Sequence, residues 1–247
     1  MPRSSKRISA TGGSSVNAMQ IANAYELLAS LKHAGYLKEE RDPLWWPHSG
    51  TEQVIIGAIL TQQTKWERVE ESLAALEKTG ICSLEGLSNA DESTIASLIR
   101  PSGFYNTKAA RLKQLSANIL DTYGDFTSFA EQTDREWLLS QKGIGMESAD
   151  SILCYACKRP VMVVDSYTAR VLQALGYAFG DYMSIQSWMH EGIEAHREKV
   201  VSLYERQIPL HKVYARFHGK IVAFAKEYIR GKRVDLSVLS KSIDVHR

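Results

Sequence analysis

The chain has 247 residues, of which 44% are hydrophobic and 23% are charged, and its formal net charge is +2. This composition is ordinary for a globular protein. It excludes a long disordered chain, a collagen-like chain and, because no run approaches roughly 18 apolar residues, a chain with a membrane-spanning helix. A net charge this small gives no signal for a nucleic-acid partner, so such a partner has to be argued from motifs and from where the charges lie.

Helical periodicity begins after a short N-terminal stretch. Residues 1–18 are rich in serine and contain no acidic residue, and we expect them to form a flexible tail. Apolar side chains then recur at helical spacing from Ile21 to Leu31, and Gly35 is expected to end this first helix. The same spacing predicts further helices over residues 54–60, 69–76, 92–100 and 112–120.

Two capping-box patterns mark expected helix starts. In this pattern a Ser or Thr accepts a hydrogen bond from the backbone three residues later, and a Glu at that later position reaches back to the Ser or Thr. Ser49 with Glu52 predicts the start of the helix over 54–60, and Thr133 with Glu136 predicts the start of another.

A turn with two glycines, residues 142–145, separates two predicted helices, the second of which runs from about residue 146 to 156. Glycine permits positive φ and a close approach of the backbone to another molecule. Gly145 lies where the second helix begins, so unpaired backbone N–H groups would point outward and favour a phosphate. Ile144 is expected to be buried and to hold the turn. The alternative is an ordinary turn of a helical hairpin.

The C-terminal third continues the helical pattern after one apolar run, residues 161–164. By composition this run could be a buried strand, but the sequence offers it no partner strand, so we expect an extended link. Asp165 is placed to cap a helix that runs to Leu175. Helices near 185–206 and 210–230 complete an all-α chain.

The hairpin and Asp165 together resemble the helix-hairpin-helix DNA glycosylases of the endonuclease III superfamily, over roughly residues 40–230. The signature of that family is a Gly-x-Gly hairpin, its second helix and then a catalytic Asp after a short apolar link. The segment 59–64 resembles the family segment whose glutamine fills the gap left by a flipped base. Trp45-Trp46-Pro47, Trp66 and the stretches 142–165 and 214–220 are similar to the 3-methyladenine DNA glycosylase III branch.

The resemblance implies an all-α, endonuclease III-like fold with two helical subdomains that flank a cleft. Residues 19–45 and 130–247, from both ends of the chain, would form one subdomain. Residues 46–129 would form an inserted subdomain, and the helix-hairpin-helix motif would cover about 134–157.

The activity implied is the excision of alkylated purines of the 3-methyladenine type in base excision repair, by hydrolysis of the N-glycosidic bond. Asp165 would be the catalytic residue, because a carboxylate can stabilise an oxocarbenium-like transition state and orient or deprotonate water. Family members that also cleave the strand carry a lysine just inside the second hairpin helix, where this chain has Glu147. A monofunctional enzyme that leaves an abasic site is therefore expected.

Tryptophans provide the expected base-binding site. By resemblance, Trp45 and Trp66 flank the flipped base, while Trp46 and Pro47 line the pocket. A cationic alkylated purine over an indole gains up to roughly 2 kcal/mol when desolvated. Because two adjacent tryptophans rarely point the same way, we expect Trp45 and Trp46 to have different roles.

The expected DNA contacts come from the hairpin and from the end of an apolar helix. Lys142, Gly143 and Gly145 would contact the backbone, and Gln62 would refill the base stack, with Gln63 as the alternative. Residues 100–113 carry four cations and no acid, and three of these cations could add phosphate contacts: Lys108, Arg111 and Lys113.

No cofactor and no metal are expected. The cysteines are Cys82, Cys154 and Cys157. The four C-terminal cysteines that hold an iron–sulfur cluster in many family members therefore have no counterparts here. The closely spaced pair, Cys154 and Cys157, is interpreted as core thiols.

Lys220 lies among apolar residues, and the sequence leaves two alternatives for it. It could be buried and paired, neutral or modified, or it could reach solvent.

The expected partner is double-stranded DNA with an alkylated base, bound by a monomer with no membrane contact. So few cysteines indicate a reducing compartment, which for this family would be the bacterial cytoplasm or nucleoid. Two alternatives stay open: a glycosylase for another damaged or mismatched base, and a helix-hairpin-helix DNA-binding protein without catalytic activity.

Overall fold

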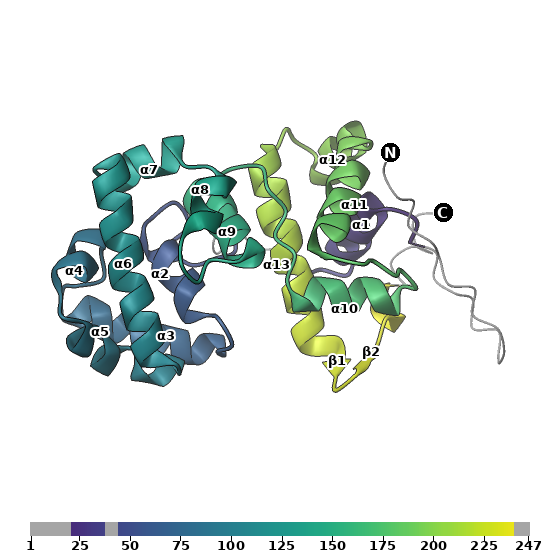
Figure 1. The fold of residues 1–247 in the computed structure, drawn as a ribbon. Helices are drawn as coiled ribbons and strands as arrows, with labels where there is room; N and C mark the ends of the chain where they lie inside the picture. Colours follow the sequence, from purple (N-terminus) through teal and green to yellow (C-terminus); the bar gives the residue numbers. More distant parts are fainter. Residues whose placement is uncertain (1–20, 38–43, 240–247) are drawn as a thin grey trace. The chain divides into compact units, whose positions relative to one another are not determined.

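The computed structural model describes residues 21–37 and 44–239, so the predicted tail over 1–18 lies outside the described residues. The chain forms two compact units, Trp46–Val161 and Met1–Trp45 together with Met162–Arg247. We call these the insert unit and the terminal unit. Figure 1 shows both units as bundles of helices, as the sequence predicted. Within the described part of the chain, no helix is long and apolar enough to cross a membrane.

The insert unit is organised around its longest helix, α6 (Tyr105–Tyr123). Buried residues of α6 recur every three or four positions from Ala109 to Ile119, and this face packs against α4, α5 and α2, while α7 packs near the helix end (Figure 1). The other elements of the unit are α2 (Gln53–Leu60), α3 (Trp66–Lys78), α4 (Leu84–Asn89), α5 (Glu92–Leu98), η1 (Arg100–Ser102), α7 (Phe126–Gln132), α8 (Arg135–Ser140), α9 (Met146–Ser151) and η2 (Ile152–Ala156).

The terminal unit is organised around α13 (Leu210–Tyr228), which is buried at nearly every position from Val213 to Ala225. The helices α1 and α10 both pack on α13, and α1 also packs on α11 (Figure 1). Apolar residues from all of these helices form one core. The other elements are α1 (Ala24–His33), α10 (Ser166–Ala174), α11 (Tyr182–Glu194), α12 (Arg197–Tyr204), β1 (Ile229–Arg230) and β2 (Arg233–Val234).

Three predicted elements differ in detail in the structure, and the sequence analysis did not predict α4 and α7. The expected helix over 185–206 is two helices, α11 and α12, with a break at Ala195 and His196. The expected helix over 210–230 ends at Tyr228 and gives way to a short antiparallel hairpin, β1 with β2. Residues 146–156 are helical throughout, but the last turn, η2, is a π-helix. The link over 161–164 forms no strand, as predicted.

Neither predicted capping box is present. The Ser49 hydroxyl donates to the carbonyl of Trp46, and the Glu52 carboxylate accepts a hydrogen bond from the Leu84 N–H at 3.0 Å, so both side chains bond elsewhere. At the second position, Asp134 caps α8 in place of Thr133 and accepts from the Trp137 N–H at 2.8 Å. A carboxylate is the stronger acceptor for a backbone N–H, which accounts for the shift by one residue.

The boundaries of the units agree with the prediction at one junction and differ at the other. The predicted boundary between residues 45 and 46 coincides with the observed one, whereas the second boundary follows Val161 rather than residue 129. The reason is that α9 and η2 pack on α2. The Gly50 N–H also donates to the carbonyl of Tyr155 at 2.7 Å. The hairpin therefore belongs to the insert unit.

Candidate functional site

Asp165 is the N-cap residue of α10, as the sequence predicted. Its Oδ1 atom accepts hydrogen bonds from the backbone N–H of Thr168 at 2.7 Å and from the hydroxyl of Thr168 at 2.8 Å. This pair of bonds fixes the carboxylate through one oxygen and leaves the other oxygen, Oδ2, for a second partner.

The second partner of Asp165 is His218 on α13, whose Nε2 atom lies 3.5 Å from Oδ2. The Asp165 side chain is only 12% exposed, and burial alone would raise its pKa. The bonds from His218 and Thr168 more than offset burial, so the pKa of Asp165 lies below its ordinary value. The carboxylate is therefore ionised at neutral pH, as the stabilisation of a positive charge requires.

Trp45 lies beside this pair in the terminal unit. Its ring meets that of His218 edge to face, with centroids 5.3 Å apart. Gly219 makes the approach possible, because a Cβ atom at that position would overlap the Trp45 ring. The backbone of Trp45 has a φ of 76°, which an aromatic residue rarely adopts. His218 was not singled out from the sequence, although it lies in the stretch 214–220 that carries the family resemblance.

Trp46 belongs to the insert unit, so the two adjacent tryptophans pack in different units, consistent with different roles. Trp46 is 7% exposed and its ring centroid lies 5.5 Å from that of Trp66 and 5.2 Å from that of Tyr155. Its indole also lies against Gly57 on α2. Pro47, the next residue, is half-buried. The insert unit thus holds an aromatic cluster of Trp46, Trp66 and Tyr155.

The turn between α2 and α3 carries the two candidate glutamines. The Gln62 amide donates to the carbonyl of Gly143 at 2.9 Å and to the hydroxyl of Ser148 at 3.1 Å. Its oxygen accepts a hydrogen bond from the Arg111 guanidinium at 3.0 Å. Gln63, in contrast, is exposed and has a φ of 54°, which places it at a left-handed bend of the turn. Gln62 therefore ties the turn to the hairpin, while Gln63 is accessible.

Lys108 holds the same turn from the other side. Its ammonium group donates, at 2.8 Å each, to the carbonyls of Leu60 and Ser102 and to the hydroxyl of Thr64. The residue is 2% exposed, and burial, followed by the charge of Arg111, lowers its pKa to about 8. The interpretation of Lys108 as a phosphate contact is therefore wrong, since its donors are used inside the insert unit.

Two more cations of the 100–113 segment are also engaged, whereas Arg100 is exposed. The ammonium of Lys113 donates to the carbonyls of Ser88 and Ala90 at the end of α4. Arg111 donates to Gln62, as described. A run of cations in the sequence is thus not a row of free surface charges, because carbonyl groups at helix ends attract ammonium groups as phosphates do.

Phe104 is a feature that the sequence analysis missed. It is 67% exposed, adopts a φ of 46° and is the N-cap residue of α6, directly after the turn that contains Ser102. The Thr64 hydroxyl donates to the carbonyl of Ser102, so the turn of Phe104 and the turn of Gln63 are joined. A large aromatic side chain held open to solvent on a strained turn has no packing role.

The hairpin has the predicted local geometry. Gly143 has a φ of 86°, and a Cβ atom there would overlap the Arg111 side chain. Gly145 is the N-cap residue of α9, Ile144 is buried, and Lys142 is exposed. Glu147, in the first turn of α9, is exposed.

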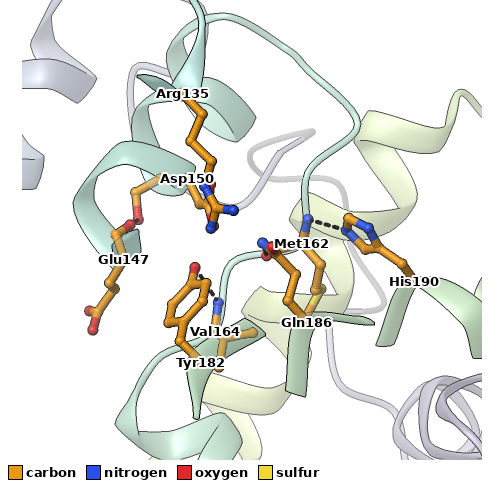
Figure 2. Close-up of polar contacts among 9 residues, drawn as sticks. Arg135, Glu147, Asp150, Met162, Val164, Tyr182, Gln186 and His190 are labelled. Carbon is orange, nitrogen blue, oxygen red and sulfur yellow. Dashed lines mark hydrogen bonds and ion pairs between the residues drawn. The ribbon is translucent and has the colours of Figure 1, made fainter. Parts of the chain in front are cut away.

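A partly buried ion pair connects the two helices of the hairpin. The Arg135 guanidinium on α8 donates to the fully buried carboxylate of Asp150 on α9 at 2.7 Å (Figure 2). Loss of one partner of such a pair strongly destabilises a fold, because the other charge remains buried. This pair therefore holds the orientation of the hairpin.

Lys220 is buried, which decides between the alternatives left open by the sequence. Its ammonium donates to the carbonyl of Tyr36, and burial, followed by the nearby charges of Arg216 and Lys32, lowers its pKa to about 7.

The cysteines are free, and burial raises the pKa of Cys154 and Cys157, as expected of core thiols. No group of three or more His, Cys, Asp or Glu side chains in residues 21–37 and 44–239 could hold a metal ion.

The sequence profile described as "HhH-GPD superfamily base excision DNA repair protein" matches residues 56–192. The chain therefore belongs to the HhH-GPD superfamily, and the endonuclease III-like fold class is confirmed.

Individual relatives agree with this assignment. The crystal structure of H. pylori 3-methyladenine DNA glycosylase (MagIII) bound to 1,N6-ethenoadenine is 43% identical, with a TM-score of 0.81, over 85% of this chain and 100% of that chain. The "Putative DNA repair glycosylase MJ1434" of Methanocaldococcus jannaschii is 36% identical over 195 residues, 76% of this chain and 82% of its own length. A non-covalent endonuclease III–DNA complex shares the fold at a TM-score of 0.63 and 18% identity. Family and relatives together define a base excision repair DNA glycosylase.

Proposed function

We propose that this glycosylase is monofunctional and excises alkylated purines of the 3-methyladenine type from double-stranded DNA, leaving an abasic site. The observation that carries the proposal is the buried, ionised carboxylate of Asp165, anchored by Thr168 and paired with His218. The substrate class is supported by the 43% identity to a 3-methyladenine glycosylase solved with a modified adenine base.

In the proposed reaction, the N-glycosidic bond breaks and its electron pair leaves with the base. An alkylated purine that is already cationic departs as a neutral base, so the enzyme needs no strong general acid. The positive charge that develops on the sugar is stabilised by the Asp165 carboxylate. A water molecule then adds to C1′ of the sugar, and Asp165 orients the water and accepts its proton.

The aromatic residues supply the proposed selectivity. Trp45 and Trp66 would stack on the flipped base, and Trp46 and Pro47 would form the wall of the pocket. Indole rings favour a cationic base, by up to roughly 2 kcal/mol when it is desolvated. The packing of Trp46 against Trp66 and Tyr155 supports this, because a pocket wall must be rigid to discriminate.

For the flipped-out state, we assign the filling of the base stack to Gln63, the alternative that the sequence left open, rather than to Gln62. Both ends of the Gln62 amide are engaged by the hairpin and Arg111, whereas Gln63 is exposed. Phe104 would contribute a second, apolar contact to the stack, because an exposed ring can occupy a space between bases. Lys142, Gly143 and Gly145 would contact the DNA backbone at the hairpin.

We further propose that the enzyme has no lyase activity, since Glu147 occupies the position at which a Schiff-base lysine would stand. We propose that it acts as a monomer on double-stranded DNA. The free cysteines are consistent with a reducing compartment such as the bacterial cytoplasm.

The experiment that tests this function is a panel of duplexes that each carry one modified base. The bases are 3-methyladenine, 7-methylguanine, 1,N6-ethenoadenine, an oxidised pyrimidine and a thymine mismatch, and the released base is measured by chromatography. Release confined to the alkylated purines supports the proposal. Release of only the pyrimidine or the mismatched thymine favours another glycosylase activity, and release of none favours a DNA-binding role alone.

A further inference from the structure

The extended link before Asp165 is held by side chains rather than by a neighbouring strand. The Met162 N–H donates to Nε2 of His190 at 3.0 Å, and the Met162 carbonyl accepts a hydrogen bond from the Gln186 amide at 2.7 Å. The Val164 N–H donates to the Tyr182 hydroxyl at 3.3 Å. Figure 2 shows Tyr182, Gln186 and His190 directed at the link.

These three side chains lie four positions apart on α11, so they project from one face of the helix. Met162 and Val164 are buried, and a buried backbone group without a partner costs about 1–3 kcal/mol. The polar ladder of Tyr182, Gln186 and His190 therefore replaces the hydrogen bonds that a partner strand would give. It fixes which residue of the link lies opposite each turn of α11.

We propose that Tyr182, Gln186 and His190 are positioning residues that set the location of the Asp165 carboxylate. The inference rests on the proposed catalytic role of Asp165. Val164, bound by Tyr182, immediately precedes Asp165, and the chain then enters α10. A shift of the link along α11, even by less than the spacing between two residues, would move the Asp165 carboxylate relative to the sugar of the bound nucleotide. Misplacement of a reacting group by about 1 Å can cost on the order of 100-fold in rate.

Each hydrogen bond of the polar ladder requires a particular chemical group on the side chain. His190 must accept a hydrogen bond at Nε2, so a glutamine, whose side-chain oxygen reaches a similar position, can replace it, whereas a leucine cannot. His190 also stacks on Tyr214, with ring centroids 4.7 Å apart, so a leucine retains part of the packing while losing the acceptor. Tyr182→Phe removes only the hydroxyl group.

The test compares His190→Leu, His190→Gln and Tyr182→Phe with wild type and with Ser187→Ala, an exposed α11 position beside the ladder. The readouts are the single-turnover rate of base release, the affinity for an abasic-site duplex, and amide hydrogen exchange at Met162 and Val164. We expect His190→Leu and Tyr182→Phe to lower the rate by about tenfold or more and to accelerate exchange, with affinity unchanged. His190→Gln should restore the rate, and Ser187→Ala should match wild type.

A wild-type rate in His190→Leu and Tyr182→Phe, or an equal loss in His190→Gln and His190→Leu, would overturn the positioning role. A weakened affinity with an unchanged rate would also overturn it, because the ladder would then serve DNA binding. Wild-type protein that releases no base from any duplex of the panel would overturn the proposed function, and this inference with it. The two failures are therefore distinguishable.

Discussion

The side-chain amide of Gln62 donates a 2.9 Å hydrogen bond to the backbone carbonyl of Gly143, 81 positions further along the chain. The bond joins the turn after α2 to the turn of the helix-hairpin-helix motif. Arg111 donates to Gln62, and its side chain occupies the space where a Cβ atom of residue 143 would lie. The two proposed DNA-contacting turns of the insert unit are therefore one hydrogen-bonded assembly rather than two independent loops.

This relationship predicts different effects for the two adjacent glutamines. Gln62→Ala removes two donated bonds and one accepted bond, and should lower the free energy of unfolding by about 1–3 kcal/mol. Gln63→Ala should change stability by less than about 0.5 kcal/mol, because the side chain is exposed. It should nevertheless slow base release by about tenfold, since flipping costs a few kcal/mol and the refilling contact is lost. Denaturant unfolding and single-turnover release measure the two effects, and normal release by Gln63→Ala would contradict the assignment.

Lys108 provides a prediction on stability and pH. Lys108→Met removes the donor to three acceptors, of which the Ser102 carbonyl keeps its bond from the Thr64 hydroxyl, and should lower the free energy of unfolding by about 2 kcal/mol or more. The pKa of Lys108 is about 8 in the folded state and 10.5 ordinarily, so the unfolded state holds more protons between these values. The contribution of Lys108 to stability therefore rises with pH across this window.

The measurement is urea unfolding of wild type and Lys108→Met at several pH values across that window. The wild-type protein should gain stability relative to the variant as the pH rises. A difference that stays constant with pH would show that the lysine is not charged and buried as described.

The contribution of Asp165 to stability also rises with pH, but in the acidic range. Its folded-state pKa lies below the ordinary value of 3.8, so its contribution is fully present above that value and is lost as the pH falls through the lowered pKa. Acid unfolding of wild type and Asp165→Asn should therefore converge only in strongly acidic solution. Convergence already near pH 5, on the order of one unit above the ordinary pKa, would mean that the carboxylate is not stabilised in its ionised form.

The proposed absence of lyase activity is tested by borohydride reduction of the enzyme on alkylated and abasic DNA. A Schiff base between a lysine and the sugar would be trapped as a covalent adduct. With Glu147 at the position of the lysine, we expect released base but no adduct. An endonuclease III with lyase activity serves as the positive control, and efficient trapping by this protein would disprove monofunctionality.

Local features of the fold were predictable from the sequence. The extended link, the cap at Asp165 and the positive φ at Gly143 all follow from patterns within a few residues, and the structure confirms each of them. The burial of Ile144 was equally predictable, because one apolar residue between two glycines has only the core to pack against.

Features that depend on distant partners were not predictable. Lys108 lies in a run of cations that suggested phosphate contacts, yet its partners are the ends of two other helical elements, at Leu60 and Ser102. His218 became part of the site only through its approach to Asp165, 53 positions earlier in the chain. The second boundary between the units was misplaced for the same reason, because helical periodicity does not reveal which helices pack together.

The central claim, that Asp165 carries the chemistry, is tested most directly by comparing base release from methylated duplex DNA by wild type and Asp165→Asn. The asparagine oxygen can still accept the Thr168 N–H bond, so the fold should be retained. Asp125→Asn is the matched control, because Asp125 caps α7 with the same geometry and has no proposed catalytic role. We predict that Asp165→Asn loses on the order of 100-fold or more in rate with DNA affinity intact, while Asp125→Asn releases base normally. Equal release by Asp165→Asn and wild type would contradict the account.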